Sequence, residues 1–366
     1  MTKHVLLVEP DYYSKYPPIG LLKLSTYHKE KGDTTELVQK NKFPKKAPDL
    51  VYVTSLFTWA WRPVWRAVRV FKAWFPNAEI WLGGLYASLL PDHASLAGAD
   101  RIHQGIFYEA EDLKPDYNLV PDWDGSIIFA SRGCNNRCVF CAVPRLEGKI
   151  HSSKRSIKPL IWSEHTKIIF FDNNILASKY WRNIFDEVIE LGKFVDFNQG
   201  LDSRLLHEEA ARKISRMKTG RVRLAYDQAS QKRFVKRAIE LLYENGVPKR
   251  DILVYVLYNF VESPDDFFQR IRDVLGWGAV CYPMRFQPCD TLRKNSYISK
   301  KWDKKRLEMV QSARRVIGYG GAFPPYEGLV KKFEKADGFD QAFALWPARS
   351  NRLKPQPMIE SKQTKL

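Results

Sequence analysis

Nine short apolar runs, separated by stretches with helical periodicity, restrict the fold of this 366-residue sequence more than any other feature. The runs are HVLLVE, DLVYVTSL, EIWLGG, SIIFAS, KIIFFD, FVDFNQ, VRLAYD, ILVYVLY and AVCYPMRF. They are nearly continuously apolar, as strands of a parallel sheet are when helices cover both of its faces. Strand–helix alternation along most of the chain therefore predicts an α/β fold.

The segment LKPDYNLVPDWDGS interrupts both periodicities with Pro, Asp and Asn and marks a boundary. Before it, in residues 1–122, we expect a Rossmann-like open sheet. After it, in residues 123–290, about six further strands are expected. Residues 291–366 hold 17 Lys and Arg against 7 Asp and Glu, which predicts a basic, helical C-terminal extension.

The net charge of +18 is the largest deviation in composition. It favours polyanion partners such as nucleic acid, and a well-solvated basic surface is the alternative. No apolar stretch is long enough to span a bilayer, and the N-terminus lacks the apolar core of a signal peptide. Five cysteines in a long chain are not typical of a secreted disulfide scaffold. We therefore expect a cytoplasmic protein without a membrane partner.

The segment CNNRCVFC, residues 134–141, carries three of the five cysteines in a C-x3-C-x2-C spacing. A disulfide with a spare thiol is disfavoured in a reducing compartment. A zinc site needs a fourth ligand, for which His151 is the nearest candidate, and a ferredoxin cluster uses four thiolates. In the remaining interpretation, three thiolates bind three irons of a [4Fe–4S] cluster, and the fourth iron stays open to a substrate.

This spacing, with Phe140 just before the last cysteine, resembles the signature of radical S-adenosylmethionine (radical SAM) enzymes. The resemblance extends over residues 1–290 and implies a partial (β/α)6 barrel. It implies that Cys134, Cys138 and Cys141 hold the [4Fe–4S] cluster and that S-adenosylmethionine (SAM) binds the open iron. The reduced cluster would then cleave SAM into methionine and a 5′-deoxyadenosyl radical. An electron donor such as flavodoxin or ferredoxin is the implied partner.

The resemblance also implies SAM contacts at the ends of the later strands. FFDNNILAS occupies the place of a second-strand motif that is usually Gly-Gly-Glu, and FNQGLDSRLL follows the next strand. LVYVLYNFVESPDD occupies the place of the adenine-side motif but lacks its usual glycines. The expected SAM-binding residues are Phe140, Asp172, Asn173, Gln199, Asp202, Arg204 and Glu262. For each of them, an ordinary polar or aromatic residue near a strand end is the alternative.

The first part of the chain resembles the N-terminal domain of cobalamin-binding-type radical SAM proteins, in the segments PPIGLLKLSTYHKEKG, PDLVYVTSL and AEIWLGGLYAS. The family's Asp-x-His-x-x-Gly motif, whose histidine binds cobalt, is absent, because EPDYYSKY has no histidine. Gly83 and Gly84 allow a close approach of a ligand or a helix, and Trp81 and Tyr86 are large enough to fill the same slot. Cobalamin is thus compatible with this domain but not favoured. A resemblance to methylthiotransferases is weaker, because they carry a second cluster on N-terminal cysteines and none precedes Cys134.

Two other segments leave alternatives open. In TWAWRPVWRAVRVFKAW, three arginines fall on one helical face and an apolar stripe on another, which indicates either a solvated surface or a nucleic-acid contact. The arginines are Arg62, Arg66 and Arg69. Cys289, in RFQPC, should lie at the active-site end of the last strand, as an inert thiol or as a catalytic hydrogen donor or radical relay.

The leading hypothesis is a radical SAM enzyme that modifies an unidentified substrate, with nucleic acid or an associated protein as the candidate. The alternatives are a cobalamin-dependent methylase of a small molecule and a non-catalytic, nucleic-acid-binding iron–sulfur protein.

Overall fold

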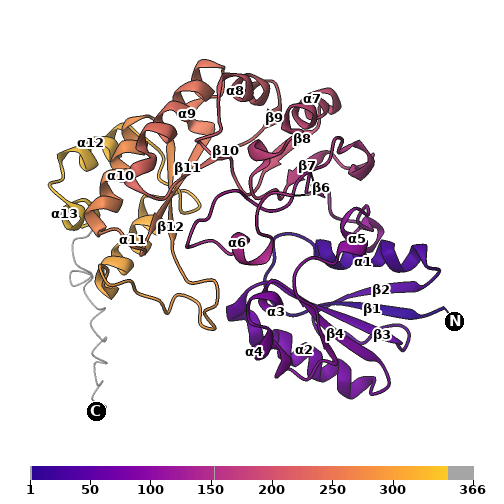
Figure 1. Ribbon diagram of the computed structural model, residues 1–366. Helices are drawn as coiled ribbons and strands as arrows, with labels where there is room; N and C mark the ends of the chain where they lie inside the picture. Colours follow the sequence, from indigo (N-terminus) through magenta and orange to yellow (C-terminus); the bar gives the residue numbers. More distant parts are fainter. Residues whose placement is uncertain (1, 152, 345–366) are drawn as a thin grey trace, which may run out of the picture.

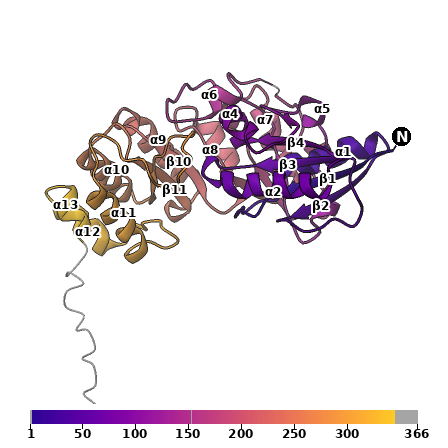
Figure 2. The ribbon, with the colours of Figure 1, turned by 90° about the horizontal axis from the view of Figure 1, so that it is seen from below.

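The computed structural model describes residues 2–151 and 153–344, which form two α/β units side by side (Figure 1). Seen from below, the helices that end the described chain lie on the side of the second unit away from the N-terminus (Figure 2). The last part of the expected C-terminal extension, residues 345–366, lies outside the described residues. In the described part of the chain, no helix combines the length and the hydropathy that crossing a bilayer requires.

The first unit is a five-stranded parallel sheet with the strand order β2-β1-β3-β4-β5. Its strands are β1 (His4–Glu9), β2 (Thr34–Gln39), β3 (Leu50–Ser55), β4 (Glu79–Gly84) and β5 (Arg101–Ile102). Its helices are α1 (Ile19–Glu30), α2 (Trp61–Trp74), α3 (Leu85–Leu89), α4 (Pro91–Ser95) and α5 (Tyr108–Glu111). The three predicted strands are the central ones, and the two edge strands were not predicted.

Successive residues of β1 serve two different cores. Leu6 and Val8 join a cluster with α2, whereas Val5 and Leu7 join a cluster with α1. All four side chains are fully buried. The apolar run of β1 is continuous because a helix layer covers each face of the sheet, as the sequence predicted.

The second unit contains the six predicted strands as β6 (Ser126–Ile128), β7 (Lys167–Phe170), β8 (Phe194–Phe197), β10 (Val222–Tyr226), β11 (Ile252–Tyr258) and β12 (Val280–Arg285). A two-residue strand, β9 (Lys218–Thr219), is additional. The strands form two parallel hydrogen-bonded sets, β6-β7-β8-β9 and β10-β11-β12. A main-chain bond of 2.8 Å from Leu201 N to Arg223 O joins the end of the first set to the second.

Helices surround these strands in the manner of a partial barrel (Figure 1). They are α6 (Val143–Leu146), α7 (Trp181–Leu191), α8 (Glu208–Ser215), α9 (Lys232–Glu244) and α10 (Pro264–Gly276). Helix α10 begins with a reciprocal capping box between Ser263 and Asp266, and Pro264 is its first residue. The α/β architecture of the prediction is thus confirmed.

The C-terminal helices continue the core of the barrel. They are α11 (Lys304–Val316), α12 (Glu327–Lys335) and α13 (Phe339–Phe343). Leu307, Phe333 and Phe343 belong to the same buried cluster as the barrel strands, and Phe343 stacks on Phe267 of α10 with ring centroids 5.9 Å apart. The described part of the extension therefore packs as a layer of the second unit.

Candidate functional site

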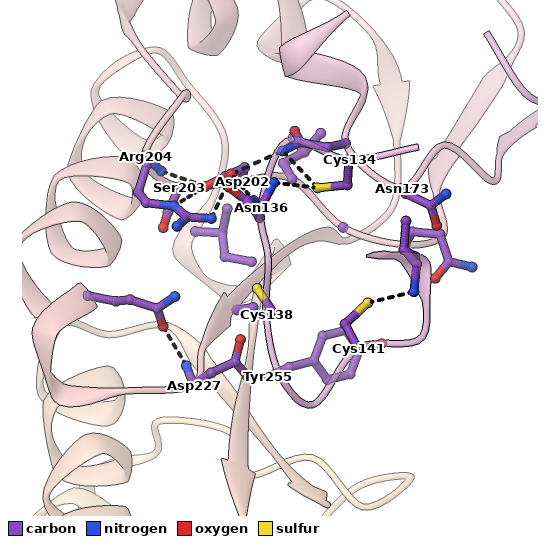
Figure 3. Close-up of a pocket in the computed structure, with 18 of the residues that line it drawn as sticks. Cys134, Asn136, Cys138, Cys141, Asn173, Asp202, Ser203, Arg204, Asp227 and Tyr255 are labelled. Carbon is purple, nitrogen blue, oxygen red and sulfur yellow. Dashed lines mark hydrogen bonds and ion pairs between the residues drawn. The ribbon is translucent and has the colours of Figure 1, made fainter. Parts of the chain in front are cut away.

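A cavity lies where the barrel strands end, between the three-cysteine loop, the segments that follow β7, β8 and β10, and Tyr255 within β11 (Figure 3). Parallel α/β proteins place their ligands at this end of the strands. The residues that give the cavity its chemistry carry sulfur, polar groups or rings: Cys134, Asn136, Cys138, Phe140, Cys141, Asn173, Asn174, Gln199, Asp202, Ser203, Arg204, Asp227 and Tyr255.

The main chain holds the three-cysteine loop in place. Cys134 N donates to Gly148 O at 3.0 Å, and Cys141 N donates to Cys138 O at 3.0 Å. Gly133 has a φ of +78°, and a Cβ at this position would lie 2.2 Å from Lys149 O. Only glycine fits there, so the residue before Cys134 is part of what closes the loop.

The sulfur atoms receive N–H donors as well. Asn136 N and Asn174 Nδ2 donate to Cys134 Sγ at 3.4 and 3.7 Å, and Val143 N donates to Cys141 Sγ at 3.4 Å. Such bonds stabilise thiolates and tune the potential of a cluster that they ligate. Burial raises the pKa of the Cys138 and Cys141 thiols, so in the absence of iron both are protonated at neutral pH.

The cysteines do not by themselves form a single-ion site. Among residues 2–151 and 153–344, no three His, Cys, Asp or Glu side chains converge as ligands of one ion. Thiolates that bind three different irons need not converge on one point. His151 pairs with Arg132 in an isolated β-bridge and is not among the residues that line the cavity. The zinc alternative thus lacks its fourth ligand.

Asp202 organises the polar wall beside the cysteines. Its carboxylate accepts hydrogen bonds from Asn136 Nδ2 at 2.8 Å, from Asn174 Nδ2 at 3.1 Å and from the Arg204 guanidinium at 2.8 and 2.9 Å. Burial by itself would raise the pKa of Asp202, but the bonds from Arg204 and Asn136 outweigh it and lower that pKa. The side chain is therefore ionised at neutral pH.

Asn174 is a buried amide that is only partly hydrogen-bonded. The residue is 3% exposed, and its Nδ2 is used by Asp202 and Cys134. Its Oδ1 is buried and has no hydrogen-bond partner among the described residues. Because a buried, unsatisfied carbonyl is costly, this oxygen is suited to accept a hydrogen bond from a bound molecule, such as the amino group of SAM.

Five of the seven residues expected to contact SAM line the cavity, namely Phe140, Asn173, Gln199, Asp202 and Arg204. Asp172 does not, because its carboxylate is turned to the backbone. It accepts bonds from Ala130 N and from the N and Oγ of Ser131, and burial raises its pKa to about 6. Asp172 therefore braces the start of the cysteine loop, and its second neighbour Asn174 reaches the cavity.

Glu262 is likewise outside the cavity. It accepts a bond from Ala229 N at 3.0 Å and pairs with the buried Arg270 at 2.8 Å. Cys289 lies behind the cysteine loop, where its Sγ donates to Phe140 O at 3.6 Å, and it is not a lining residue. Cys281 is fully buried in the barrel core, as expected.

The sequence analysis did not name Asn136, Asn174, Asp227 and Tyr255 as site residues. Asp227 directly follows β10, and burial raises its pKa to about 6 against the opposing effect of Arg270 and Arg204. Its position at the end of a predicted strand was the signal that could have identified it. Tyr255 lies within β11 on the inner surface, which only the strand register reveals.

A buried ionic network connects the cysteine loop to the first unit. Arg132, two residues before Cys134, donates to both carboxylate oxygens of Glu111 at 2.7 and 2.8 Å and pairs with Glu147 at 3.3 Å. Glu111 also pairs with Lys23 at 3.1 Å. Burial lowers the pKa of Lys23 to about 8, although Glu111 opposes the shift. The base of the loop is thus fixed by side chains of α1 and α5.

The corresponding edge of the first unit is filled by the chain itself. A Cβ at Gly84, whose φ is +96°, would lie 2.2 Å from Ser55 O, and one at Gly83 would lie 3.6 Å from the His103 Cβ. Tyr86 is fully buried, and its hydroxyl bonds to Trp65 Nε1 at 2.9 Å. Gly84 is therefore required where β4 passes close to Ser55 of β3, whereas a Cβ at Gly83 would make only an ordinary contact. Tyr86, one of the two large residues expected to fill space here, is buried beside them.

Comparison with known proteins is consistent with this architecture. No protein-family model matches the chain. The ribosomal protein uS12 methylthiotransferase RimO of Helicobacter acinonychis (strain Sheeba) is 30% identical over 113 residues, which are 28% of this chain and 26% of the relative. The chain thus matches about a quarter of that relative's length.

Two solved structures of the radical S-adenosylmethionine methyltransferase TsrM from Kitasatospora setae are similar in fold. One, with cobalamin and a [4Fe–4S] cluster bound, has a TM-score of 0.62 at 13% identity and covers 87% of this chain and 76% of its own. The other, with tryptophan substrate and the SAM analog aza-SAM, has a TM-score of 0.59 at 14% identity and covers 86% and 77%. The predicted resemblance in fold, an open sheet followed by a radical SAM barrel, is confirmed.

Proposed function

We propose that this chain is a radical SAM enzyme that binds a [4Fe–4S] cluster through Cys134, Cys138 and Cys141 and cleaves SAM reductively. The observation that carries the proposal is the convergence of three thiols, with no fourth cysteine among the lining residues, on the cavity that holds the unpartnered Asn174 oxygen. When bound, the cluster would supply one electron to SAM and so generate a 5′-deoxyadenosyl radical. The fold shared with radical SAM proteins supports this assignment.

The chain's own residues supply binding and orientation. Asn174 Oδ1 accepts a donor from the ligand, while the ionised Asp202 fixes the amides of Asn136 and Asn174. The Arg204 guanidinium, held by Asp202, presents positive charge near the cavity to a carboxylate such as that of SAM. Phe140 packs edge-on against Phe260 with centroids 5.5 Å apart and provides an apolar wall.

Anaerobic reconstitution followed by chemical reduction tests the proposal. The reconstituted protein should convert SAM into methionine and 5′-deoxyadenosine, which chromatography with mass detection measures. An electron donor such as flavodoxin or ferredoxin should replace the chemical reductant. If the reconstituted protein holds the cluster but produces no 5′-deoxyadenosine, the cluster has a structural role, as in the non-catalytic iron–sulfur alternative.

A cobalamin-dependent methylase of a small molecule is the second candidate, favoured by the similar solved structure that contains cobalamin. The filled surroundings of Gly83, Gly84 and Tyr86 argue against it. We expect reconstituted protein to retain well under one equivalent of cobalamin and to cleave SAM without it. Stoichiometric retention, with an absorption spectrum that a bulky substitution at Gly84 alters, would establish the methylase candidate instead.

A further inference from the structure

The outer face of α2 forms a shallow groove that combines tryptophans and arginines. It is lined by Trp61, Arg62, Trp65, Arg66, Arg69, Val70 and Ala73. Trp61 and Trp65 meet edge to face with centroids 4.7 Å apart. The Arg62 guanidinium lies 4.7 Å from the Trp61 ring centre, and that of Arg69 lies 5.0 Å from the Trp65 ring centre.

The groove belongs to the surface and not to the core. The opposite face of α2 carries Val64, Val68 and Phe71, all of them fully buried against the sheet. Arg62, Arg66 and Arg69 are exposed, as the periodicity of the sequence predicted. Trp61 and Trp65 also pack inward against the buried cluster of the first unit, whereas the three arginines stay on the surface.

The three guanidinium groups have no internal counter-charge. Across the described ranges 2–151 and 153–344, none of them forms an ion pair with a carboxylate, whereas the neighbouring Lys72 pairs with Asp100 at 2.6 Å. Arg62 and Arg69 lie over these two indole rings as cation–π pairs, which hold the guanidinium planes and the indoles together. The face thus presents spaced positive charges together with flat stacking surfaces.

We propose that the α2 groove binds single-stranded nucleic acid, with Arg62, Arg66 and Arg69 on phosphates and the Trp61 edge of the groove against a base. Proteins that bind single strands combine these two elements, a basic track for the backbone and aromatic or guanidinium planes for the bases. Duplex bases are stacked and unavailable to such planes. An acidic protein would match the charge but would leave the indole surfaces unused.

The N-terminal end of the groove is the end nearer the barrel. The loop that leads into α2 contacts the segment after β12, since Thr58 Oγ1 donates to Thr291 O at 2.6 Å. That loop carries the same combination of groups: Phe57 stacks on Trp59 with centroids 4.5 Å apart, and Lys294 lies 5.9 Å from the Trp59 ring centre. A strand on α2 would therefore continue toward the junction of the two units.

Fluorescence anisotropy of the full chain with labelled oligouridylate and oligothymidylate tests this inference. The triple variant Arg62→Gln/Arg66→Gln/Arg69→Gln should bind at least about tenfold more weakly, and the slope of log affinity against log salt should fall by about 2. The matched control Arg233→Gln/Lys236→Gln/Arg237→Gln removes three exposed positive charges from α9, which carries no tryptophan. It should bind as the wild type does within about twofold, if the α2 site is specific.

A second variant separates stacking from charge. Trp61→Leu should weaken binding about fivefold or more with an unchanged salt slope, because it removes a stacking plane and no charge. Trp65 is left intact because its Nε1 bonds to Tyr86. A thermal melt of each variant checks that it is folded.

Three outcomes would overturn the inference: equal losses in the α2 and α9 triple variants, displacement of the oligonucleotide by oligoglutamate of equal charge, or tighter binding of duplex than of single strands. The ratio of oligouridylate to oligothymidylate affinity tells RNA from DNA. The inference does not rest on the proposed radical chemistry. A Cys138→Ala variant without cluster should bind oligonucleotide as the wild type does, so the two proposals fail separately.

Discussion

The two units end their parallel strands in opposite ways. At the carboxyl edge of the barrel, cysteines, amides and carboxylates surround a cavity, and the Asn174 Oδ1 in its wall has no partner among the described residues. At the carboxyl edge of the first sheet, Gly84 lets β4 pass close to Ser55 of β3, and Tyr86 is fully buried. The barrel edge is therefore hollow, whereas the sheet edge is closely packed at Gly84.

The comparison shows that a glycine near a strand end can have either of two structural roles. Gly133 is required because Lys149 O, in the segment after α6, would lie 2.2 Å from a Cβ there, and this close approach holds the start of the cysteine loop. Gly84 is required for the same steric reason, but the neighbour is Ser55 of the adjacent strand. A close approach at a glycine therefore does not by itself distinguish a ligand site from a packing site, whereas the cavity beside the cysteine loop does.

The largest effect is expected from the cysteine loop. Cys138→Ala should lose cluster iron and all SAM cleavage, because only Cys134 and Cys141 would remain in the cavity lining and no spare cysteine there can take the place of Cys138. Cys281→Ala is the control, since that thiol is fully buried in the core and should leave the iron content unchanged. Iron analysis after anaerobic reconstitution measures both. A full complement of iron in the Cys138 variant would remove the basis of the contrast between the two edges.

A substitution at the closely packed edge of the first sheet should lower the stability of the protein. Gly84→Ala forces a Cβ into Ser55 at a φ of +96° and should lower the free energy of unfolding by about 4 kcal/mol. Gly98→Ala has a similar φ of +92° but open space around it, and should cost only about 1 kcal/mol. Urea denaturation followed by tryptophan fluorescence compares the two. If both substitutions lowered the free energy of unfolding equally, the positive φ alone, and not the contact with Ser55, would explain why glycine is needed at position 84.

The network between the units should give a pH-dependent effect. Glu111→Gln leaves Arg132 and Lys23 without their shared carboxylate and should cost about 2 kcal/mol at neutral pH. Burial opposes ionisation of Glu111, but Arg132 and Lys23 outweigh it and hold its pKa below 4.5.

Because this folded-state pKa is lowered, the stabilisation is complete above pH 4.5 and is lost as the pH falls through the folded-state value. Urea midpoints of wild type and variant should therefore converge on acidification. Glu190→Gln, at an exposed pair with Lys158, is the control and should show little change at any pH. If the difference in urea midpoint between wild type and Glu111→Gln did not change with pH, the lost stability would come from side-chain packing and not from the carboxylate charge.

The smallest effect concerns the open edge. Asp227, whose pKa burial raises to about 6, should be ionised above that pH and protonated below it. If its carboxylate accepts a donor from SAM, SAM binding should weaken as the pH falls through about 6. Asp227→Asn should weaken SAM binding about tenfold at neutral pH and abolish this pH dependence. Isothermal titration with the reconstituted protein measures both quantities, and an unchanged pH profile would exclude Asp227 from the ligand contacts.

The strands that the sequence predicted are short runs rich in β-branched and aromatic residues. Strands β2, β5 and β9 were missed because TTELVQ alternates and because two-residue strands have no pattern to read. The cysteine loop was predictable because ligand spacing is local in the sequence. The roles of Asp172 and Asn174 were not, since they depend on which way the chain turns after β7.

Ion pairs between residues far apart in the sequence could not be predicted either. Nothing near Arg132 in the sequence indicates that Glu111 neutralises it, because the two lie on either side of the predicted boundary. Glu262 was expected near the ligand, but the buried Arg270 on the next helix holds it. The partner of a buried charged group depends on distances and burial in the folded chain, and local sequence patterns carry no information about either.

The ion pair between Arg132 and Glu111 also bears on how such a protein can be divided or recombined. A fragment that begins at residue 123 would keep Arg132 and the cysteine loop but lose Glu111, and it would also lose the hydrogen bond that Ile127 N donates to Tyr117 Oη. Such a barrel would keep only Glu147 as the partner of Arg132 at the base of the loop. In a gene fusion or domain exchange, an incoming first unit with a carboxylate at the place of Glu111 is therefore expected to stabilise the loop more than one without it.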